Sequence, residues 1–169
     1  FLSFKGEYLM KVIKEVIPYI VIVVVVVLIR TFIITPVRVD GDSMKNTLKN
    51  GDILLLYKLS SIDRFDIIVL DEEKDNEKII KRVIGLPGET VAIKKGKIYI
   101  NDKEIDDEYA YGETSDYNKV TLRDDEYFIL GDNRLISKDS RYFGPIKDNE
   151  IKGKIVFRLF PFTKIGTVQ

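Results

Sequence analysis

The chain begins with one long apolar stretch. Residues 16–34 are apolar apart from four positions: Pro18, Tyr19, Arg30 and Thr31. As a helix this stretch would be roughly 28 Å long, close to the hydrocarbon thickness of a bilayer. A buried valine-rich strand fits less well, because strands usually run for only about four to eight residues. A cleavable signal peptide also fits less well, since no Ala-x-Ala-like site follows. The pattern predicts a membrane anchor over residues 16–35.

Charges beside this stretch suggest its orientation. Three lysines precede it and two basic residues follow closely: Lys5, Lys11, Lys14, Arg38 and Lys45. This distribution weakly favours a cytoplasmic segment at residues 1–15 and an extracytoplasmic domain at residues 36–169. Arg30 is then expected near the outer interface, where its long stem can reach water. Because the chain starts with Phe1 instead of Met, we expect further residues to precede it.

After Pro36 the pattern changes to short apolar runs separated by polar turns. The runs of strand length are residues 53–57, 66–70, 79–84, 91–93, 97–100, 126–130 and 154–160. The acidic segment 71–76 is expected to be a hairpin loop between two of them. The polar stretch from Asn101 to Asp125 predicts a small inserted β excursion, placed at residues 94–127. With no repeat and no second long helix, the fold class is mainly β, an antiparallel domain behind a transmembrane helix.

Composition removes several classes of function. Acidic and basic residues balance at 27 each, so we expect no nucleic-acid partner and no general attraction to anionic lipid. The chain has neither cysteine nor histidine, which excludes disulfides, thiol catalysis and ordinary zinc sites. The acidic residues lack EF-hand spacing, so no metal site is expected. A Ser-His-Asp triad is impossible without histidine, and a serine nucleophile would need another base, for which lysine is the known substitute.

Ser43 is the first candidate for this chemistry. It lies in Gly-Asp-Ser-Met, a turn-like segment shortly after the apolar stretch. Taken alone, a simple turn serine is the more economical interpretation. Gly41 would let the backbone approach a substrate closely, and the amide of Ser43 could then face a developing oxyanion.

Lys81 is the candidate base. A strand period of two places Lys81 on the same face as Ile79 and Val83. Burial between these β-branched neighbours would lower the pKa of the amine and favour the neutral form that a base needs. A lysine on an edge strand that reaches water fits the same pattern, and the strand alone leaves both interpretations open.

A third polar segment, residues 131–144, completes the set of candidates. If its second half is extended, Ser137, Asp139 and Arg141 project to one side. The serine could then hold a lysine amine, and the ion pair could brace the loop. Taken alone, the segment also fits a polar surface loop with a Gly-Asp-Asn turn.

Four ordered blocks behind an apolar N-terminal stretch resemble the bacterial type I signal peptidases. They are Gly41-Asp42-Ser43-Met44-Lys45-Asn46-Thr47-Leu48, Gly51-Asp52-Ile53, Lys81-Arg82-Val83-Ile84-Gly85-Leu86-Pro87-Gly88 and Gly131-Asp132-Asn133-Arg134 through Arg141. The resemblance covers almost the whole chain, and the short excursion resembles the compact forms found in Gram-positive bacteria. It implies a catalytic β domain of the signal-peptidase type.

The resemblance also implies the catalytic roles. Ser43 would be the nucleophile, Lys81 the general base, and Ser137 the residue that hydrogen-bonds and orients the lysine amine. Two positions differ from the family pattern. Asn46 stands where proline is usual, and Gly41 stands where some members have a serine that contributes to the oxyanion hole. The backbone amide of Ser43 would then stabilise more of the oxyanion charge.

The same resemblance implies supporting residues. Asp139 would form an ion pair with Arg141, and Asp132 would form one with Arg82. Met44 would lie beside the nucleophile in an apolar surface that faces the bilayer.

The function implied is that of a membrane-anchored serine endopeptidase in the plasma membrane. Its partners would be exported preproteins and the lipid bilayer, and it would cut signal peptides after small-x-small sites without a cofactor. The sequence leaves the oligomeric state open. Two alternatives remain: a self-cleaving serine–lysine peptidase of the SOS-repressor type, and a catalytically inactive membrane-tethered β-domain that binds exported proteins.

Overall fold

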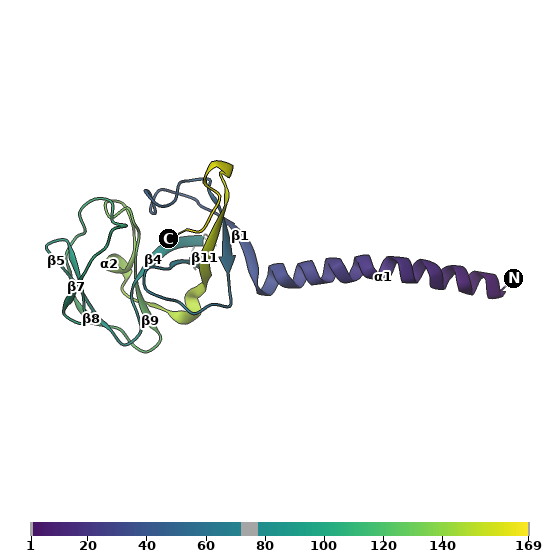
Figure 1. Cartoon of the computed structure of the whole chain (residues 1–169). Helices are drawn as coiled ribbons and strands as arrows, with labels where there is room; N and C mark the ends of the chain where they lie inside the picture. Colours follow the sequence, from purple (N-terminus) through teal and green to yellow (C-terminus); the bar gives the residue numbers. More distant parts are fainter. Residues whose placement is uncertain (1, 72–77, 169) are drawn as a thin grey trace. The chain divides into compact units, whose positions relative to one another are not determined.

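The computed structural model describes residues 2–71 and 78–168 (Figure 1). It divides into two compact units, Phe1–Thr35 and Pro36–Gln169. The hairpin loop predicted at residues 71–76 lies outside the described residues except for Asp71, which ends a strand.

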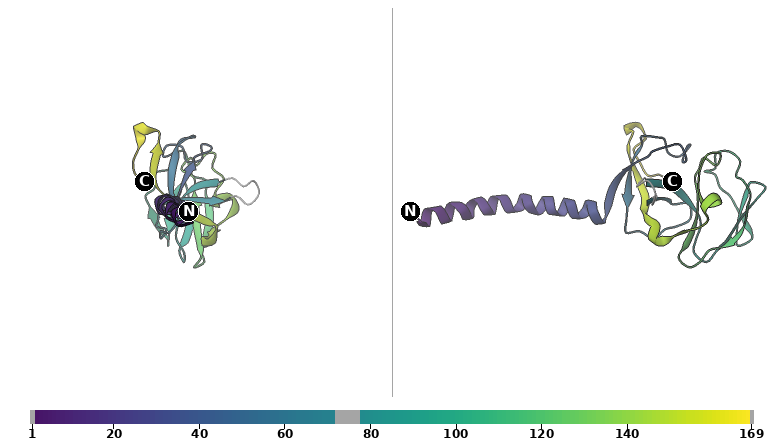
Figure 2. Two further views of the ribbon diagram at one scale, coloured as in Figure 1. Left: turned by 90° about the vertical axis from the view of Figure 1, so that its right-hand side faces the viewer. Right: turned by 180° about the vertical axis from the view of Figure 1, so that it is seen from behind.

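The first unit is the helix α1 (Leu2–Phe32), drawn as one continuous helix in Figure 2. Its segment Met10–Phe32 is 23 residues long, has a mean hydropathy of 2.8 and buries none of its length in the protein. A valine-rich run has only modest helix propensity, but in lipid a helix satisfies every backbone hydrogen bond within the segment. Pro18 lies inside α1. The length and exposed apolar surface of this segment suit a bilayer span.

The second unit is built on a seven-stranded sheet with the order β1-β2-β11-β3-β4-β9-β10. The strands are β1 (Ile34–Arg38), β2 (Ile53–Tyr57), β3 (Ile67–Asp71), β4 (Lys78–Gly85), β9 (Glu126–Leu130), β10 (Ile146–Lys147) and β11 (Ile151–Phe160). β11 pairs antiparallel with both β2 and β3, and β4 pairs antiparallel with β3 and β9. β4 is therefore an interior strand, and both of its edges are hydrogen-bonded.

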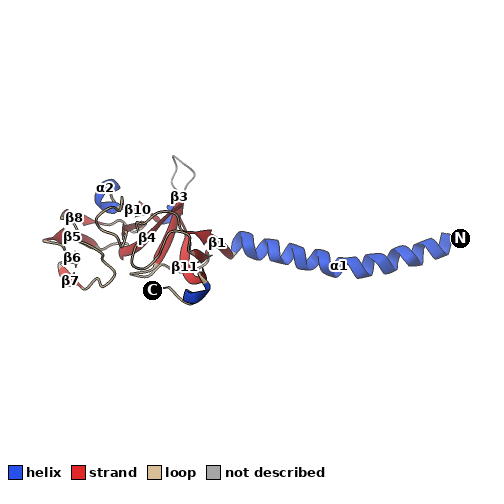
Figure 3. Cartoon of the chain, turned by 90° about the horizontal axis from the view of Figure 1, so that it is seen from above, coloured by secondary structure: helices blue, strands red, loops and turns tan. Residues whose placement is uncertain are grey.

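The chain segment between β4 and β9 forms a second, four-stranded antiparallel sheet with the order β7-β6-β5-β8. Its strands are β5 (Thr90–Lys94), β6 (Lys97–Ile100), β7 (Lys103–Ile105) and β8 (Tyr117–Thr121). The remaining elements are short: α2 (Ser140–Phe143), η1 (Asp148–Glu150) and η2 (Phe162–Lys164). Figure 3 shows that strands dominate this unit, which confirms the prediction of a mainly antiparallel β domain after an apolar helix.

The core packs on both faces of β4. Ile80 belongs to one apolar cluster, with Leu54, Leu56 and Ile67 among its members. Val83 belongs to another cluster on the opposite face. Alternate residues of an interior strand therefore enter two different apolar environments. The two basic residues in the middle of β4 lie on opposite faces, and both are buried.

Candidate active site

Lys81 is set in the apolar face of β4. Its side chain is buried, with the residue only 4% exposed. It lies opposite Ile68 in the β3–β4 register. Its same-face neighbours Ile79 and Val83 belong to the cluster that also contains Ile68 and Ile129. Of the two interpretations that the sequence allowed, the structure shows the buried lysine, because β4 is an interior strand.

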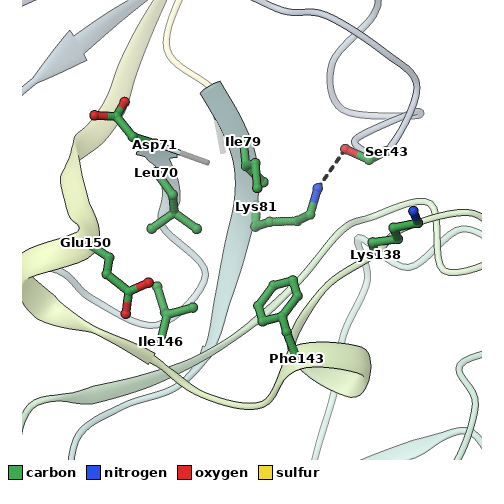
Figure 4. Close-up of a pocket in the computed structure, with 9 residues that line it drawn as sticks. All are labelled: Ser43, Leu70, Asp71, Ile79, Lys81, Lys138, Phe143, Ile146 and Glu150. Atoms are coloured by element: carbon green, nitrogen blue, oxygen red, sulfur yellow. Dashed lines mark hydrogen bonds between the residues drawn. The ribbon is translucent and has the colours of Figure 1, made fainter. Parts of the chain in front are cut away.

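Ser43 lies in the loop between β1 and β2 and is half-buried. The Nζ of Lys81 donates a hydrogen bond to the Oγ of Ser43 at 3.0 Å (Figure 4). A short amine–hydroxyl hydrogen bond is the geometry that proton transfer between the two groups requires. The structure therefore brings together the serine and the lysine that the sequence singled out, from positions 38 residues apart.

Asn133 holds the backbone on which Ser43 sits. Its main-chain N–H donates to the carbonyl oxygen of Ser43 at 2.9 Å. Its side-chain Nδ2 donates to the carbonyl oxygen of Asp42 at 3.1 Å. Asn133 was not predicted as a site residue, although it belongs to the Gly-Asp-Asn-Arg block. Its role depends on a contact between loops that are distant in sequence.

Ser137 lies beside Ser43 but does not make the predicted bond. It is 1% exposed, and among the described residues its Oγ has no hydrogen-bond partner. A Cβ added to Gly131 would lie 2.1 Å from this Oγ and 2.7 Å from the carbonyl oxygen of Ser43. Ser137 therefore packs against the end of β9, next to Ser43. Among the described residues the Ser137 hydroxyl does not make the hydrogen bond to the Lys81 amine that the resemblance implied.

Asp139 and Arg141 form a two-pronged ion pair. The Nε and Nη2 of Arg141 donate to the two carboxylate oxygens of Asp139 at 2.8 and 2.9 Å. The main-chain N–H of Gly131 donates to the same carboxylate at 3.0 Å. Asp139 also caps the N-terminus of α2. The pair thus links α2 to the end of β9, directly beside Ser137.

Asp132 and Arg82 form a second pair, deeper in the protein. Arg82 donates to the two Asp132 oxygens at 2.9 and 2.8 Å, and both side chains are 0% exposed. Arg82 also donates to the carbonyl oxygen of Phe65, and the hydroxyl of Thr47 donates to Asp132. The ring centroid of Tyr109 lies 3.6 Å from the guanidinium carbon of Arg82. This set of partners satisfies charges that would otherwise be costly to bury.

Met44 does not lie where it was expected. It is 2% exposed and belongs to the same apolar cluster as Leu48 and Ile80. The loop turns back directly after Ser43, and the N–H groups of Thr47 and Leu48 donate to the carbonyl oxygen of Met44. Met44 therefore anchors the loop in the core and is too deeply buried to form part of an apolar surface.

Gly41 is exposed at a left-handed turn with φ of +88°. Such a conformation favours glycine. A Cβ added to Gly41 would have no atom of the described residues within 4 Å. In the described part of the chain, the turn therefore leaves open space two residues before Ser43.

Arg134 ties the small sheet to the loop that follows β9. Its Nε donates to the carbonyl oxygen of Gly131 at 2.9 Å, and its Nη1 donates to the hydroxyl of Thr114 at 2.9 Å. Its Nη2 forms a buried ion pair with Asp107. Asp107, Thr114 and Tyr109 were not predicted from the sequence, because they lie in the polar excursion with no local pattern to distinguish them.

A cavity of about 450 Å³ opens beside the Ser43–Lys81 pair. Its lining consists of Ser43, Leu70, Asp71, Ile79, Lys81, Lys138, Phe143, Ile146 and Glu150 (Figure 4). Within residues 10–71 and 78–168, no group of three or more acidic side chains is arranged to hold a metal ion. The chemistry available here is that of a hydroxyl and a buried amine beside a cavity with both apolar and charged lining residues.

Comparison with known proteins identifies the class. The family model for signal peptidase, peptidase S26, matches residues 10–160. Signal peptidase I of Streptococcus pneumoniae (TIGR4) is 37% identical over 190 residues, covering 88% of this chain and 93% of that protein. Signal peptidase I of Bacillus caldolyticus is 42% identical over 168 residues, covering 88% and 92%. A crystal structure of a signal peptidase I from Enterococcus faecalis V583 superposes with a TM-score of 0.50 at 34% identity, covering 56% of this chain and 97% of that one.

The fold and these relatives define a membrane-associated serine peptidase. The chain belongs to the signal peptidase I family, peptidase S26, as the resemblance of its four blocks predicted. The family removes signal peptides from exported preproteins.

Proposed function

We propose that Ser43 and Lys81 form the catalytic dyad of this peptidase. The observation that carries the proposal is the 3.0 Å hydrogen bond between the Lys81 amine and the Ser43 hydroxyl, made by a lysine that is 4% exposed. Burial disfavours the charged form of an amine, so a lysine in this setting suits the neutral base that the proposal requires. An exposed lysine would stay protonated at neutral pH and could not act as a base.

The proposed reaction has two steps. The neutral Lys81 amine takes the proton of Ser43 while the hydroxyl oxygen attacks the scissile carbonyl carbon. The resulting ammonium then returns the proton to the leaving nitrogen as the peptide bond breaks, which leaves an ester on Ser43. In the second step the same amine activates a water that hydrolyses the ester. The main-chain N–H of Ser43 is the proposed oxyanion donor, because Gly41 supplies no hydroxyl.

Ser137 is proposed to orient the amine during this cycle. Its hydroxyl is buried beside the Ser43 backbone and has no hydrogen-bond partner among the described residues. When Ser43 becomes acylated it no longer offers the same hydroxyl to Lys81. The Ser137 hydroxyl is a group close by that could then accept a hydrogen bond from the amine, and the Asp139–Arg141 pair beside it would fix its loop.

The proposed topology places residues 1–15 in the cytoplasm, an anchor over residues 16–35 and the catalytic domain on the outer side of the plasma membrane. The exposed apolar segment Met10–Phe32 supports the anchor, and the basic residues before it support the orientation. Holding enzyme and preprotein in one bilayer raises their effective concentration. We further propose that the cut follows small-x-small sites.

Cleavage of a purified preprotein by the full chain in detergent–lipid micelles tests the dyad. We expect one cut after a small-x-small site, and no detectable product from Ser43→Ala or Lys81→Ala. Lys97→Ala removes an exposed lysine of the small sheet and serves as the matched control. Product masses locate the cut. Unimpaired cleavage by Lys81→Ala would refute the lysine as base, whereas cleavage at another sequence would refute only the specificity.

The pH dependence supplies a second test. Because the amine acts in its neutral form, the single-turnover rate is expected to rise with pH through the pKa of Lys81 and then level off. Single-turnover conditions keep product release from hiding the chemical step. A rate that stays constant across the neutral to alkaline range would contradict the proposed base.

A further inference from the structure

The cavity beside the dyad extends well beyond the two reacting groups. Leu70, Ile79 and Ile146 supply apolar walls, and the first and last of these are 4% and 5% exposed. Phe143 of α2 contributes an aromatic ring that is 48% exposed. The cavity thus has buried aliphatic side chains on one side and an accessible aromatic ring on another. Its volume lies within the range of about 300–1,000 Å³ typical of ligand sites.

Charge is distributed unevenly along this cavity. Figure 4 shows the carboxylates of Asp71 and Glu150 on the side of Lys81 away from Ser43, whereas Lys138 lies on the Ser43 side. Asp71 is paired with Lys152 at 3.0 Å. Glu150 accepts a hydrogen bond from the main-chain N–H of Lys147 at 2.7 Å, which fixes its carboxylate. With Lys152 offsetting the charge of Asp71, Glu150 supplies the negative charge at the end of the cavity away from Ser43, which we call the acidic end.

The chemistry of the dyad determines which half of a substrate lies along this cavity. The ammonium of Lys81 has to protonate the leaving nitrogen, so that nitrogen must lie within hydrogen-bond reach of Nζ. The chain attached to that nitrogen therefore leaves the reaction centre on the Lys81 side. A separate cavity of about 400 Å³ is lined by Arg38, Asp40, Gly41 and Lys78, and it borders the backbone that leads into Ser43 without including Lys81. That cavity is placed to meet the acyl half.

We propose that the cavity lined by Phe143 and Ile146 binds the first two residues after the scissile bond. It accepts an apolar side chain against Phe143, Ile146 and Leu70, and it disfavours an acidic side chain because of Glu150. The proposal rests on the proposed dyad, since the direction of the leaving chain is set by Lys81. It makes the enzyme selective for the start of the released protein as well as for the end of the signal peptide.

A pair of substrates separates this site from the dyad. Both have the same sequence up to the scissile bond, and one continues with leucine at the two positions after it while the other ends in a methylamide. Phe143→Ala is expected to lower kcat/KM for the continued substrate about tenfold and to change that for the methylamide less than twofold. The matched control is Tyr142→Ala, which removes the neighbouring aromatic ring that does not line the cavity. We expect it to leave both substrates within twofold of the intact chain.

The outcomes distinguish the two proposals. Equal losses of kcat/KM on both substrates, or the same losses in Tyr142→Ala, would overturn the proposed binding of the residues after the scissile bond. If the intact chain cut neither of these substrates and no preprotein either, the dyad assignment would fail instead.

The charge of the cavity gives an independent measurement. In the intact chain, kcat/KM is expected to be at least fivefold higher for leucine than for aspartate at one of the two positions after the cut. Glu150→Gln keeps a side-chain acceptor for the Lys147 amide and removes the negative charge, so it should reduce that ratio at least twofold. A ratio near one in the intact chain, or a ratio unchanged by Glu150→Gln, would contradict the role assigned to the acidic end.

Discussion

The two sheets of the second unit carry ion pairs of nearly equal length in opposite surroundings. On the small sheet, Lys119 and Asp102 approach to 2.7 Å, with side chains that are 47% and 72% exposed. Beside the large sheet, Arg82 and Asp132 approach to 2.8 Å, with side chains that are 0% exposed. The distance therefore does not distinguish the pairs, but their access to water does. The free energy of unfolding and the activity should depend on the buried pair and hardly at all on the exposed one.

The physical reason lies in desolvation. An exposed pair gains little, because water solvates the separated charges almost as well and salt screens them. A buried pair has already lost its water, so removing one partner leaves the other charge uncompensated. In this chain the buried pair also borders the proposed reaction centre, since Asp132 is followed directly by Asn133, which holds the Ser43 backbone. The buried ion pair and the proposed dyad therefore lie together beside the large sheet.

The largest stability effect is expected from Asp132→Ala. This substitution leaves the guanidinium of Arg82 buried without its carboxylate, which should cost about 3–5 kcal/mol of unfolding free energy. Urea unfolding of the full chain in micelles measures the loss, with Asp102→Ala on the small sheet as the matched control. Adding Arg82→Leu to an Asp132→Leu variant should recover part of the loss, because no charge then stays buried. A loss below about 1 kcal/mol would show that water reaches the pair.

Gly131→Ala should come next, with an effect on both stability and cleavage. A Cβ at this position would lie 2.5 Å from the Cβ of Ser137 and 2.7 Å from the carbonyl oxygen of Ser43. The Ser43 backbone has to shift, so we expect a loss of about 1–3 kcal/mol and at least a tenfold slower single-turnover rate.

Gly96→Ala is the comparison on the small sheet. Gly96 has φ of +77°, but in the described part of the chain no atom lies closer than 3.8 Å to a Cβ added there. This variant should lose stability through backbone strain and keep its cleavage rate. A normal cleavage rate in Gly131→Ala would show that the close packing does not position Ser43.

The sequence was informative where the chemistry follows a local period. Alternation along residues 79–84 predicted the strand and the face that holds Lys81, and β4 carries that lysine among apolar neighbours. The antiparallel β class was also predictable, because the apolar runs had strand length and turns separated them. Alternation could not show which strand lies at an edge, since that depends on pairing between distant segments.

The errors and omissions concern loops. Met44 was expected on an apolar surface, but the turn after Ser43 directs it into the core. The hydrogen bond between Ser137 and Lys81 was implied by resemblance, whereas the Ser137 hydroxyl has no hydrogen-bond partner among the described residues. Tyr109 lies in a polar excursion with no periodic pattern, and its ring contacts Arg82 on a strand that precedes the whole small sheet. Contacts of this kind depend on tertiary packing and leave no local signal.

Tyr109→Ala tests whether a residue from the inserted segment supports the buried Arg82–Asp132 pair. The Tyr109 ring covers the Arg82 guanidinium at 3.6 Å and also contacts the ring of Phe65. Its removal should cost about 1–2 kcal/mol, through the lost cation–π contact and the water admitted to the pair. Tyr109→Phe keeps the ring and should behave like the intact chain. Equal losses in both variants, measured by urea unfolding, would assign the effect to the hydroxyl instead.

The smallest effect is expected from Asp102→Asn. The hydrogen bond from Lys119, together with its positive charge, lowers the pKa of the Asp102 carboxyl below its ordinary value. A lowered pKa stabilises the folded state above the unfolded-state pKa, and this contribution disappears as the pH falls through the folded-state pKa. Because the carboxyl is exposed, water and salt screen most of the contribution. Urea midpoints of the variant and the intact chain should therefore agree within error at neutral pH, in low and high salt alike. A deficit in the variant that grows at low salt, and approaches that of Asp132→Ala, would show that the two sheets do not differ as their exposure to water indicates.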